Sequence, residues 1–246
     1  HVSDDETYYH LLDRELPIEG FGYGVEAYGT TQEYLLLKKL IPDINPDIVV
    51  WQLCYNDFVN NSPRLEANSK YNNSGHRRPY LTAEGELEYI LPRRNAWLRS
   101  LSRYSRLLSY FLYQYDRYAA NTRESVEAYI GKQGDSHPGF RRAARKTEML
   151  FRMARREWPD LPIVAFCVDP YDPYLSEFRS ILEETGISYM EGLPGALARA
   201  EDAGKVVRSV DGYHWNPVGH RICADLLSDY LSEHFLGSPL KRKSGR

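Results

Sequence analysis

The sequence has few cysteines, no long apolar run and little excess charge, and each shortage excludes a class of protein. Its three cysteines, Cys54, Cys167 and Cys223, lie far apart among 246 residues and form no C-x-x-C pair. Neither a disulfide framework nor a metal site is therefore expected. No stretch reaches the roughly 18 apolar residues that span a bilayer, so no integral membrane segment is predicted.

The charge balance gives no general attraction to polyanions. The formal net charge is -3, which excludes a strong overall pull toward nucleic acid or anionic lipid. One basic run, from Arg141 to Arg156, is interpreted as a solvated helix face. A nucleic-acid-binding function that rests on this run is the weakest alternative, and no nucleic-acid partner is predicted.

The length and the 42% hydrophobic content fit one globular domain. We expect this domain over residues 1–238, with an irregular and helical insertion at about 59–139 and a basic tail at 239–246. Helical and strand-like patterns alternate outside the insertion, which predicts a parallel sheet with helices on both faces.

The expected elements follow from the apolar periodicity and from the turn residues between them. The helices are expected at Thr7–Leu16, Thr31–Leu40, Phe140–Trp158, Tyr174–Glu184 and Leu193–Ala203, and a last helix begins at Pro217 with Asn216 as its cap. The strands are expected at Ile18–Val25, Ile48–Leu53, Ile163–Val168 and Ile187–Met190, the first and last being weak.

The segment from about Val59 to Leu91 loses this periodicity and is predicted to be irregular. Trp97–Tyr118 is predicted to be helical, because large apolar residues recur at three and four positions. This stripe consists of Tyr104, Leu107, Leu108, Phe111, Tyr115 and Tyr118. We expect it to pack on the core, with a roof over a substrate cleft, a membrane or a partner as alternatives.

A carboxylate stands three residues before a histidine in the loop that precedes the last helix. Asp211 can hold the imidazole of His214 in one tautomer and stabilise its protonated form, as a histidine that deprotonates a serine requires. The alternative is that Asp211 only makes a turn and His214 only satisfies a nearby carbonyl.

Two further residues follow predicted strands, where ligands bind in open α/β sheets. Gly29 can offer a backbone N–H that a ligand can approach closely, and Asn56 can aim a side-chain NH2 at the same place. Together they would form two donors of an oxyanion hole. Alone, each motif is more typical of an ordinary turn or cap.

Taken in order, the segments Ala27–Glu33, Tyr55–Asp57 and Asp211–His214 resemble the SGNH hydrolases, also called the GDSL esterase/lipase family. The resemblance implies a flavodoxin-like three-layer α/β/α sandwich whose first strand is missing from this chain. It implies Gly29 and Asn56 as oxyanion donors, His214 as general base and Asp211 as its orienting partner. Tyr55, Asp57, Tyr213 and Trp215 are expected to contact the substrate.

The nucleophile stays unassigned. The family places its serine in a Gly-Asp-Ser-Leu-like block at the end of the first strand, and we expect that block upstream of His1. Gly134-Asp135-Ser136 spells the motif but follows a polar stretch and lies after the asparagine block, so we interpret it as chance. Ser3 lies too late and among acidic residues.

The resemblance implies a serine-type esterase that acts on a small-molecule or glycan ester and needs no cofactor. One alternative is a carbohydrate O-acetyltransferase or deacetylase with the same triad, since Tyr55, Tyr213 and Trp215 suit stacking on a sugar ring. Another is a binding module that has lost the nucleophile. A bacterial periplasmic, secreted or membrane-anchored location, set by an upstream segment, is left open.

Overall fold

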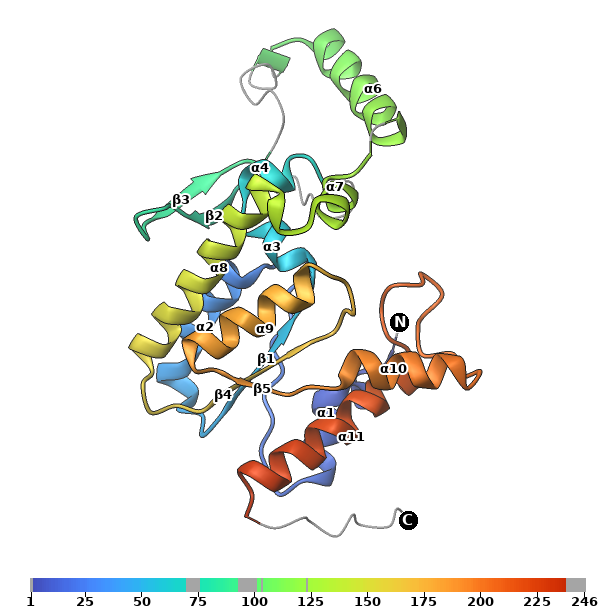
Figure 1. The fold of residues 1–246 in the computed structure, drawn as a ribbon. Coiled ribbons are helices and arrows are strands. Elements are labelled where there is room, and N and C mark those ends of the chain that lie inside the picture. The colour runs from blue at the N-terminus through green and yellow to red at the C-terminus, as the bar shows by residue number, and fades with distance from the viewer. Residues whose placement is uncertain (1, 70–75, 93–100, 103, 123, 238–246) are drawn as a thin grey trace. The chain divides into compact units, whose positions relative to one another are not determined.

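The protein's structure, a computed structural model, describes residues 2–69, 76–92, 101–102, 104–122 and 124–237 (Figure 1). The chain forms two compact units. Unit 1 comprises His1–Val25, Phe166–Pro170 and Met190–Arg246, and unit 2 comprises Glu26–Ala165 and Tyr171–Tyr189. The expectation of one domain over 1–238 stays a prediction, and the basic tail at 239–246 lies outside the described residues.

Three of the strands form a small parallel sheet with the order β1-β4-β5. β1 spans Val49–Leu53, β4 spans Ile163–Cys167 and β5 spans Ser188–Tyr189. All five residues of β4 are buried, as its continuous apolar sequence predicts for a strand covered on both sides. The strands predicted at 48–53, 163–168 and 187–190 are confirmed, with slightly shorter bounds.

The described helices of unit 2 include several that pack on one another or on β1 and one, α6, whose large apolar residues are mostly exposed. They are α2 (Thr30–Ile44), α3 (Asn56–Asn60), α4 (Pro63–Glu66), α6 (Arg106–Thr122), α7 (Val126–Gln133), α8 (Pro138–Glu157) and α9 (Tyr174–Thr185). From β1, the Trp51 ring lies 4.9 Å from the Phe151 ring of α8 and its Nε1–H donates to Glu33 of α2 at 2.8 Å. Burial raises the pKa of the Glu33 carboxyl to about 7.

The segment after α3 is more regular than predicted. The expectation of an irregular stretch over Val59–Leu91 is wrong for α4 and for an antiparallel hairpin of β2 (Arg78–Leu81) and β3 (Leu87–Ile90). The turn is closed by the Thr82 hydroxyl, which accepts the N–H groups of Glu84 and Glu86. Each of these strands has only four residues, which is too short for apolar alternation to identify it in the sequence.

α6 confirms the predicted helix from Arg106 to Tyr118, whereas Tyr104 and Ser105 are not helical and Trp97 with the rest of 93–100 lies outside the described residues. The expectation that its stripe packs on the core is wrong. Tyr104, which precedes α6, is 85% exposed. On α6 itself, Leu107 is 65% exposed and Phe111 is 59% exposed. Tyr115 and Tyr118 are exposed too, and only Leu108 is half-buried. Helical periodicity defines an apolar face, but it does not say what covers that face.

Unit 1 is mainly helical. It contains a short 3-10 turn at Asp4–Glu6 and three helices, α1 (Tyr8–Glu15), α10 (Leu193–Asp202) and α11 (Pro217–His234). The Tyr8 ring of α1 stacks on His220 of α11 with centroids 6.0 Å apart. The Tyr8 N–H donates to the Nδ1 atom of the same histidine at 3.3 Å. The predicted helices at both ends of the chain are therefore confirmed and pack together.

The strand predicted at Ile18–Val25 is wrong. This segment forms no strand, and from Glu19 onward its residues are exposed. Glycine occupies positions 20, 22 and 24, so alternate residues supply no side chain to pack and lose more backbone entropy on ordering. Its Phe21, Tyr23 and Val25 side chains are about half exposed. The α/β class is confirmed, whereas the flavodoxin-like arrangement stays a prediction.

Candidate functional site

The loop that carries Asp211 and His214 is closed by backbone contacts at its base. The Ser209 N–H donates to the His214 carbonyl at 2.7 Å, and the Asn216 N–H donates to the Val207 carbonyl at 3.0 Å. Gly212 turns the loop with a φ of 74°, where glycine carries no steric penalty. These contacts close the loop at its base and at its turn.

The Asp211 carboxylate makes both the turn and the histidine contact. Its Oδ1 atom accepts the N–H groups of Tyr213 at 2.9 Å and of His214 at 3.0 Å. Its Oδ2 atom lies 2.6 Å from His214 Nδ1. The hydrogen bond with the His214 side chain, followed by the two backbone N–H groups, lowers the pKa of Asp211 to about 2. The two interpretations of this motif are therefore compatible.

The chemistry of the pair follows from its protonation. A carboxylate with so low a pKa is ionised near neutral pH and only accepts hydrogen bonds, so Nδ1 of His214 carries the proton in this contact. That tautomer leaves Nε2 as the basic nitrogen. The His214 side chain is 76% exposed and that of Asp211 is 28% exposed. An incoming hydroxyl can therefore reach the imidazole.

The residues after His214 anchor the loop on α11. The Asn216 side chain accepts the N–H groups of Val218 and Gly219, as predicted for a helix cap. A Cβ atom on Gly219 would lie 2.5 Å from the Val207 carbonyl oxygen, so only glycine allows this close approach. Trp215 is 8% exposed and contacts the rings of Tyr8 and His220.

The aromatic neighbours of His214 differ in exposure. Trp215 has a packing role, whereas Tyr213 is 70% exposed. Substrate contact by either residue stays a prediction, and Tyr213 is the more accessible of the two.

In unit 2, the chain leaves β1 through Cys54 and enters α3 at Asn56, which is half-buried. Asp57 is 2% exposed, and its Oδ2 atom accepts the Cys54 N–H at 2.8 Å. This contact holds the turn beneath Asn56 and gives Asp57 a structural role. Its predicted contact with a substrate stays a prediction.

Tyr55 lies in an aromatic cluster formed by the loops that follow β1 and β4. Its ring makes edge contacts with Tyr171 at 5.8 Å and Tyr174 at 5.5 Å. Tyr171 is half exposed, and the buried Tyr174 hydroxyl has no hydrogen-bond partner among the described residues. The sequence analysis singled out Tyr55 but not its two tyrosine partners, which are more than 100 residues away in the chain.

Gly29 is required by close packing rather than by its backbone angles. Its φ of -122° suits any residue, but a Cβ atom there would lie 2.6 Å from the Asn60 Cβ. Its N–H donates to Gln32 Oε1 at 3.0 Å. An oxyanion at this N–H would have to replace the Gln32 oxygen. The residue with the left-handed conformation that favours glycine is instead Ala27, with a φ of 63°.

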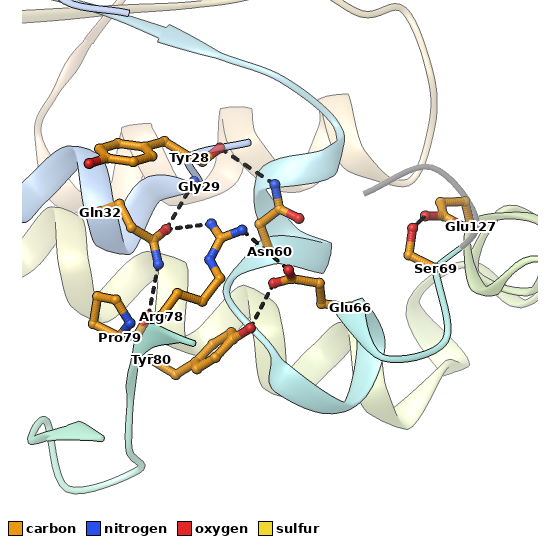
Figure 2. A network of polar contacts seen from close by, with 10 residues as sticks. All are labelled: Tyr28, Gly29, Gln32, Asn60, Glu66, Ser69, Arg78, Pro79, Tyr80 and Glu127. Carbon is orange, nitrogen blue, oxygen red and sulfur yellow. Dashed lines mark hydrogen bonds and ion pairs between the residues drawn. The ribbon is translucent and has the colours of Figure 1, made fainter. Parts of the chain in front are cut away.

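Through Gln32, Gly29 is connected to a buried polar network (Figure 2). Gln32 Oε1 also accepts from Arg78 Nη2 at 2.7 Å, and Gln32 Nε2 donates to the Pro79 carbonyl at 2.8 Å. Arg78 Nη1 lies 3.3 Å from Glu66 Oε1, and the Tyr80 hydroxyl donates to Glu66 Oε2 at 2.7 Å. Glu66 is fully buried and Arg78 is 6% exposed. This network links α2, α4 and β2.

Two polar atoms beside Gly29 were not identified by sequence reasoning. Thr30 Oγ1 and Asn60 Oδ1 are fully buried, with no hydrogen-bond partner among the described residues. The Asn60 amide donates only a long bond, of 3.4 Å, to the Tyr28 carbonyl. Buried polar atoms are almost always paired, so these two mark the Gly29 turn as a place of unsatisfied bonding capacity.

The candidate residues fall into both units. Asp211, His214, Tyr213 and Trp215 belong to unit 1, and Gly29, Tyr55, Asn56 and Asp57 belong to unit 2. Neither serine considered in the sequence contacts a histidine through its hydroxyl: Ser3 Oγ donates to Glu6 at 2.8 Å and Ser136 Oγ to the Gln133 carbonyl at 2.6 Å. The nucleophile remains unassigned.

Comparisons with protein-family models, curated proteins and solved structures match none of them to this chain. Within the part of the chain that the structure describes, no cluster of three or more His, Cys, Asp or Glu side chains is arranged to hold a metal ion. Over the same residues, no helix combines the length and the apolar sequence needed to cross a membrane.

The first prediction concerns the buried ion pair. Glu66→Ala leaves the Arg78 guanidinium buried without its carboxylate, and we expect the free energy of unfolding to fall by about 3–5 kcal/mol. Urea unfolding followed by circular dichroism measures the loss. The matched control is Glu148→Ala, which breaks the exposed i,i+4 pair with Arg152 and should cost less than about 1 kcal/mol. Equal effects of the two variants would contradict a special role for the buried pair.

The second prediction concerns Ala27. Ala27→Gly removes the steric penalty of the left-handed conformation, and we expect the free energy of unfolding to rise by about 0.5–1 kcal/mol. The control is Ala198→Gly on the exposed side of α10. It should lower the free energy of unfolding by about the same amount, because glycine loses more backbone freedom than alanine when a helix forms. Thermal unfolding compares the two. A loss of stability in both variants would show that Ala27 is not strained.

Proposed function

We propose that this protein is a serine-type hydrolase of acyl esters in which His214 acts as the general base. The observation that carries the proposal is the 2.6 Å contact between Asp211 Oδ2 and His214 Nδ1, made by a carboxylate whose pKa is about 2. An ionised partner fixes the imidazole tautomer and stabilises the imidazolium that forms when the histidine accepts a proton.

The proposed reaction proceeds in two steps. Nε2 of His214 removes the proton of a serine hydroxyl as its oxygen attacks the ester carbonyl, and the imidazolium then protonates the leaving alcohol. Water releases the acyl group by the same sequence. The serine is the one that the resemblance to SGNH hydrolases expects upstream of His1, and membership of that family is part of the proposal.

The oxyanion that forms during attack needs hydrogen-bond donors placed in advance. We assign the main donor to the Asn56 side chain, because its position after β1 is held by the Asp57 contact beneath it. The Gly29 N–H is a conditional donor, since it is engaged by Gln32. It would take part only if the Gln32 side chain moved away.

A second candidate function is transfer or removal of an acyl group on a carbohydrate. The observation that favours it is the half-exposed Tyr171 ring packed edge-on against Tyr55 after two parallel strands. Exposed aromatic rings held in place by neighbours suit the apolar face of a sugar. Comparing an acetylated glycan with a short p-nitrophenyl ester as substrates separates the two candidates.

The third prediction tests the base. In the protein expressed with all residues that its gene encodes before His1, we expect both His214→Ala and Asp211→Asn to lower kcat for p-nitrophenyl acetate at least roughly 1000-fold. The control is His234→Ala, an exposed histidine at the end of α11, which should leave kcat unchanged. Labelling by a fluorophosphonate, with mass spectrometry of the adduct, identifies the serine. Absence of labelling, or full activity without His214, would refute the proposal.

The fourth prediction tests the oxyanion donor. Asn56→Ala should lower kcat by roughly 100-fold to 1000-fold with KM and the melting temperature nearly unchanged, because the donor acts mainly in the transition state. Asn68→Ala, a half-buried asparagine whose amide donates to the Arg64 carbonyl, is the matched control and should retain activity. A near-normal kcat for Asn56→Ala removes this residue from the oxyanion hole.

A further inference from the structure

The stripe on α6 forms one continuous face of the helix. Leu107, Leu108, Phe111 and Leu112 recur at intervals of one, three and four residues, which places them side by side along the helix axis. Arg106 and Ser109 lie on the opposite side. We call the side formed by Leu107, Leu108, Phe111 and Leu112 the apolar face.

The apolar face is largely in contact with solvent. Leu107 is 65% exposed and Phe111 is 59% exposed, whereas Leu108 and Leu112 are half-buried. Tyr110, one turn after Arg106 and on the same side as it, is 57% exposed and packs its ring edge against Phe111 at 6.0 Å. Contiguous exposed apolar groups of this kind mark places where a protein meets another surface.

The sequence around this helix has the opposite charge balance to the whole chain. Residues 93–123 include seven arginines and only one acidic residue, Asp116, in a chain with a formal net charge of -3. They also include Trp97 and six tyrosines and phenylalanines. Arginine-rich segments with aromatic residues are typical of helices that lie in the interface of a bilayer with anionic lipids.

We propose that the apolar face of α6 docks on the surface of a membrane that contains anionic lipids. The arginines of the sequence 93–123 are opposite in charge to the lipid headgroups, and the tyrosine rings of α6 suit the boundary between headgroups and acyl chains. Nucleic acid shares the negative charge but offers no apolar layer in which leucine and phenylalanine side chains could be buried. The helix has 17 residues and is about 25 Å long, so it lies on the bilayer instead of crossing it.

This surface is independent of the proposed ester chemistry, because none of the candidate catalytic residues lies on α6. Docking would keep the protein close to a membrane whatever reaction it performs. Binding of the full chain to lipid vesicles therefore tests this docking without any assay of activity.

The experiment is sedimentation of the full chain with vesicles of phosphatidylcholine alone and with vesicles that contain about a third phosphatidylglycerol. We expect binding to the mixed vesicles, little binding to phosphatidylcholine, and a steep loss of binding as salt rises. Leu107→Ser and Phe111→Ser should each lower the partition coefficient about tenfold or more. Arg106→Ser should lower it about fivefold and only at low salt.

The control is Tyr89→Ser, which removes an aromatic ring of similar exposure from β3 and should leave partitioning unchanged. Circular dichroism verifies that each variant keeps the helix content of the parent. Equal partitioning of Phe111→Ser and the parent would overturn the proposal. So would a self-association in sedimentation equilibrium that Phe111→Ser abolishes while vesicles stay unbound, because the face would then bind a second copy.

Discussion

The buried pair of Glu66 and Arg78 is the interaction on which the arrangement of unit 2 around its glycine turn depends. Removing two charges from water costs several kcal/mol for each ion, and their attraction repays this only when the remaining hydrogen-bonding capacity is also used. Tyr80 and Gln32 use part of it, the first on the carboxylate and the second on the guanidinium, while the buried Arg78 Nε–H has no partner among the described residues. Because the same Gln32 oxygen accepts the Gly29 N–H, the ion pair also fixes the backbone of the turn. A substitution of Glu66 or Arg78 would therefore alter the position of Gln32 and, through it, the Gly29 N–H, a candidate oxyanion donor.

The Asp211 carboxylate shows why a turn motif and a catalytic motif share one spacing. One oxygen accepts two backbone N–H groups and so holds the histidine three residues later in a fixed place. The other oxygen is then left in reach of the imidazole. The three bonds that lower its pKa are the same ones that order the loop, so the stability of the turn and the electrostatics of His214 have one cause. Replacing Asp211 would remove both.

The sequence predicted the elements whose signal lies within a few residues. β1 and β4 were identified because short apolar runs rich in β-branched residues end at turn residues, and the Asp211 contact because its geometry is local. The contact of Gly29 with Asn60, 31 positions apart, has no such signal, since it depends on how α2 and α3 pack. The strand predicted at Ile18–Val25 was wrong because alternation of apolar residues with glycine gives the period of a strand without the side chains that stabilise one.

The contrast between α8 and α6 shows the limit of periodicity as a guide to function. Both helices have a continuous apolar stripe, and on α8 residues such as Leu150 and Phe151 are fully buried. On α6 the equivalent positions, Leu107 and Phe111, face solvent. The same periodicity thus accompanies core packing in one helix and an exposed surface in the other, so the periodicity alone does not separate them. What distinguishes the two in sequence is the surroundings: the exposed stripe is rich in tyrosine, which tolerates water at one end and lipid at the other. An exposed stripe of that composition is better suited to an interface than to a core.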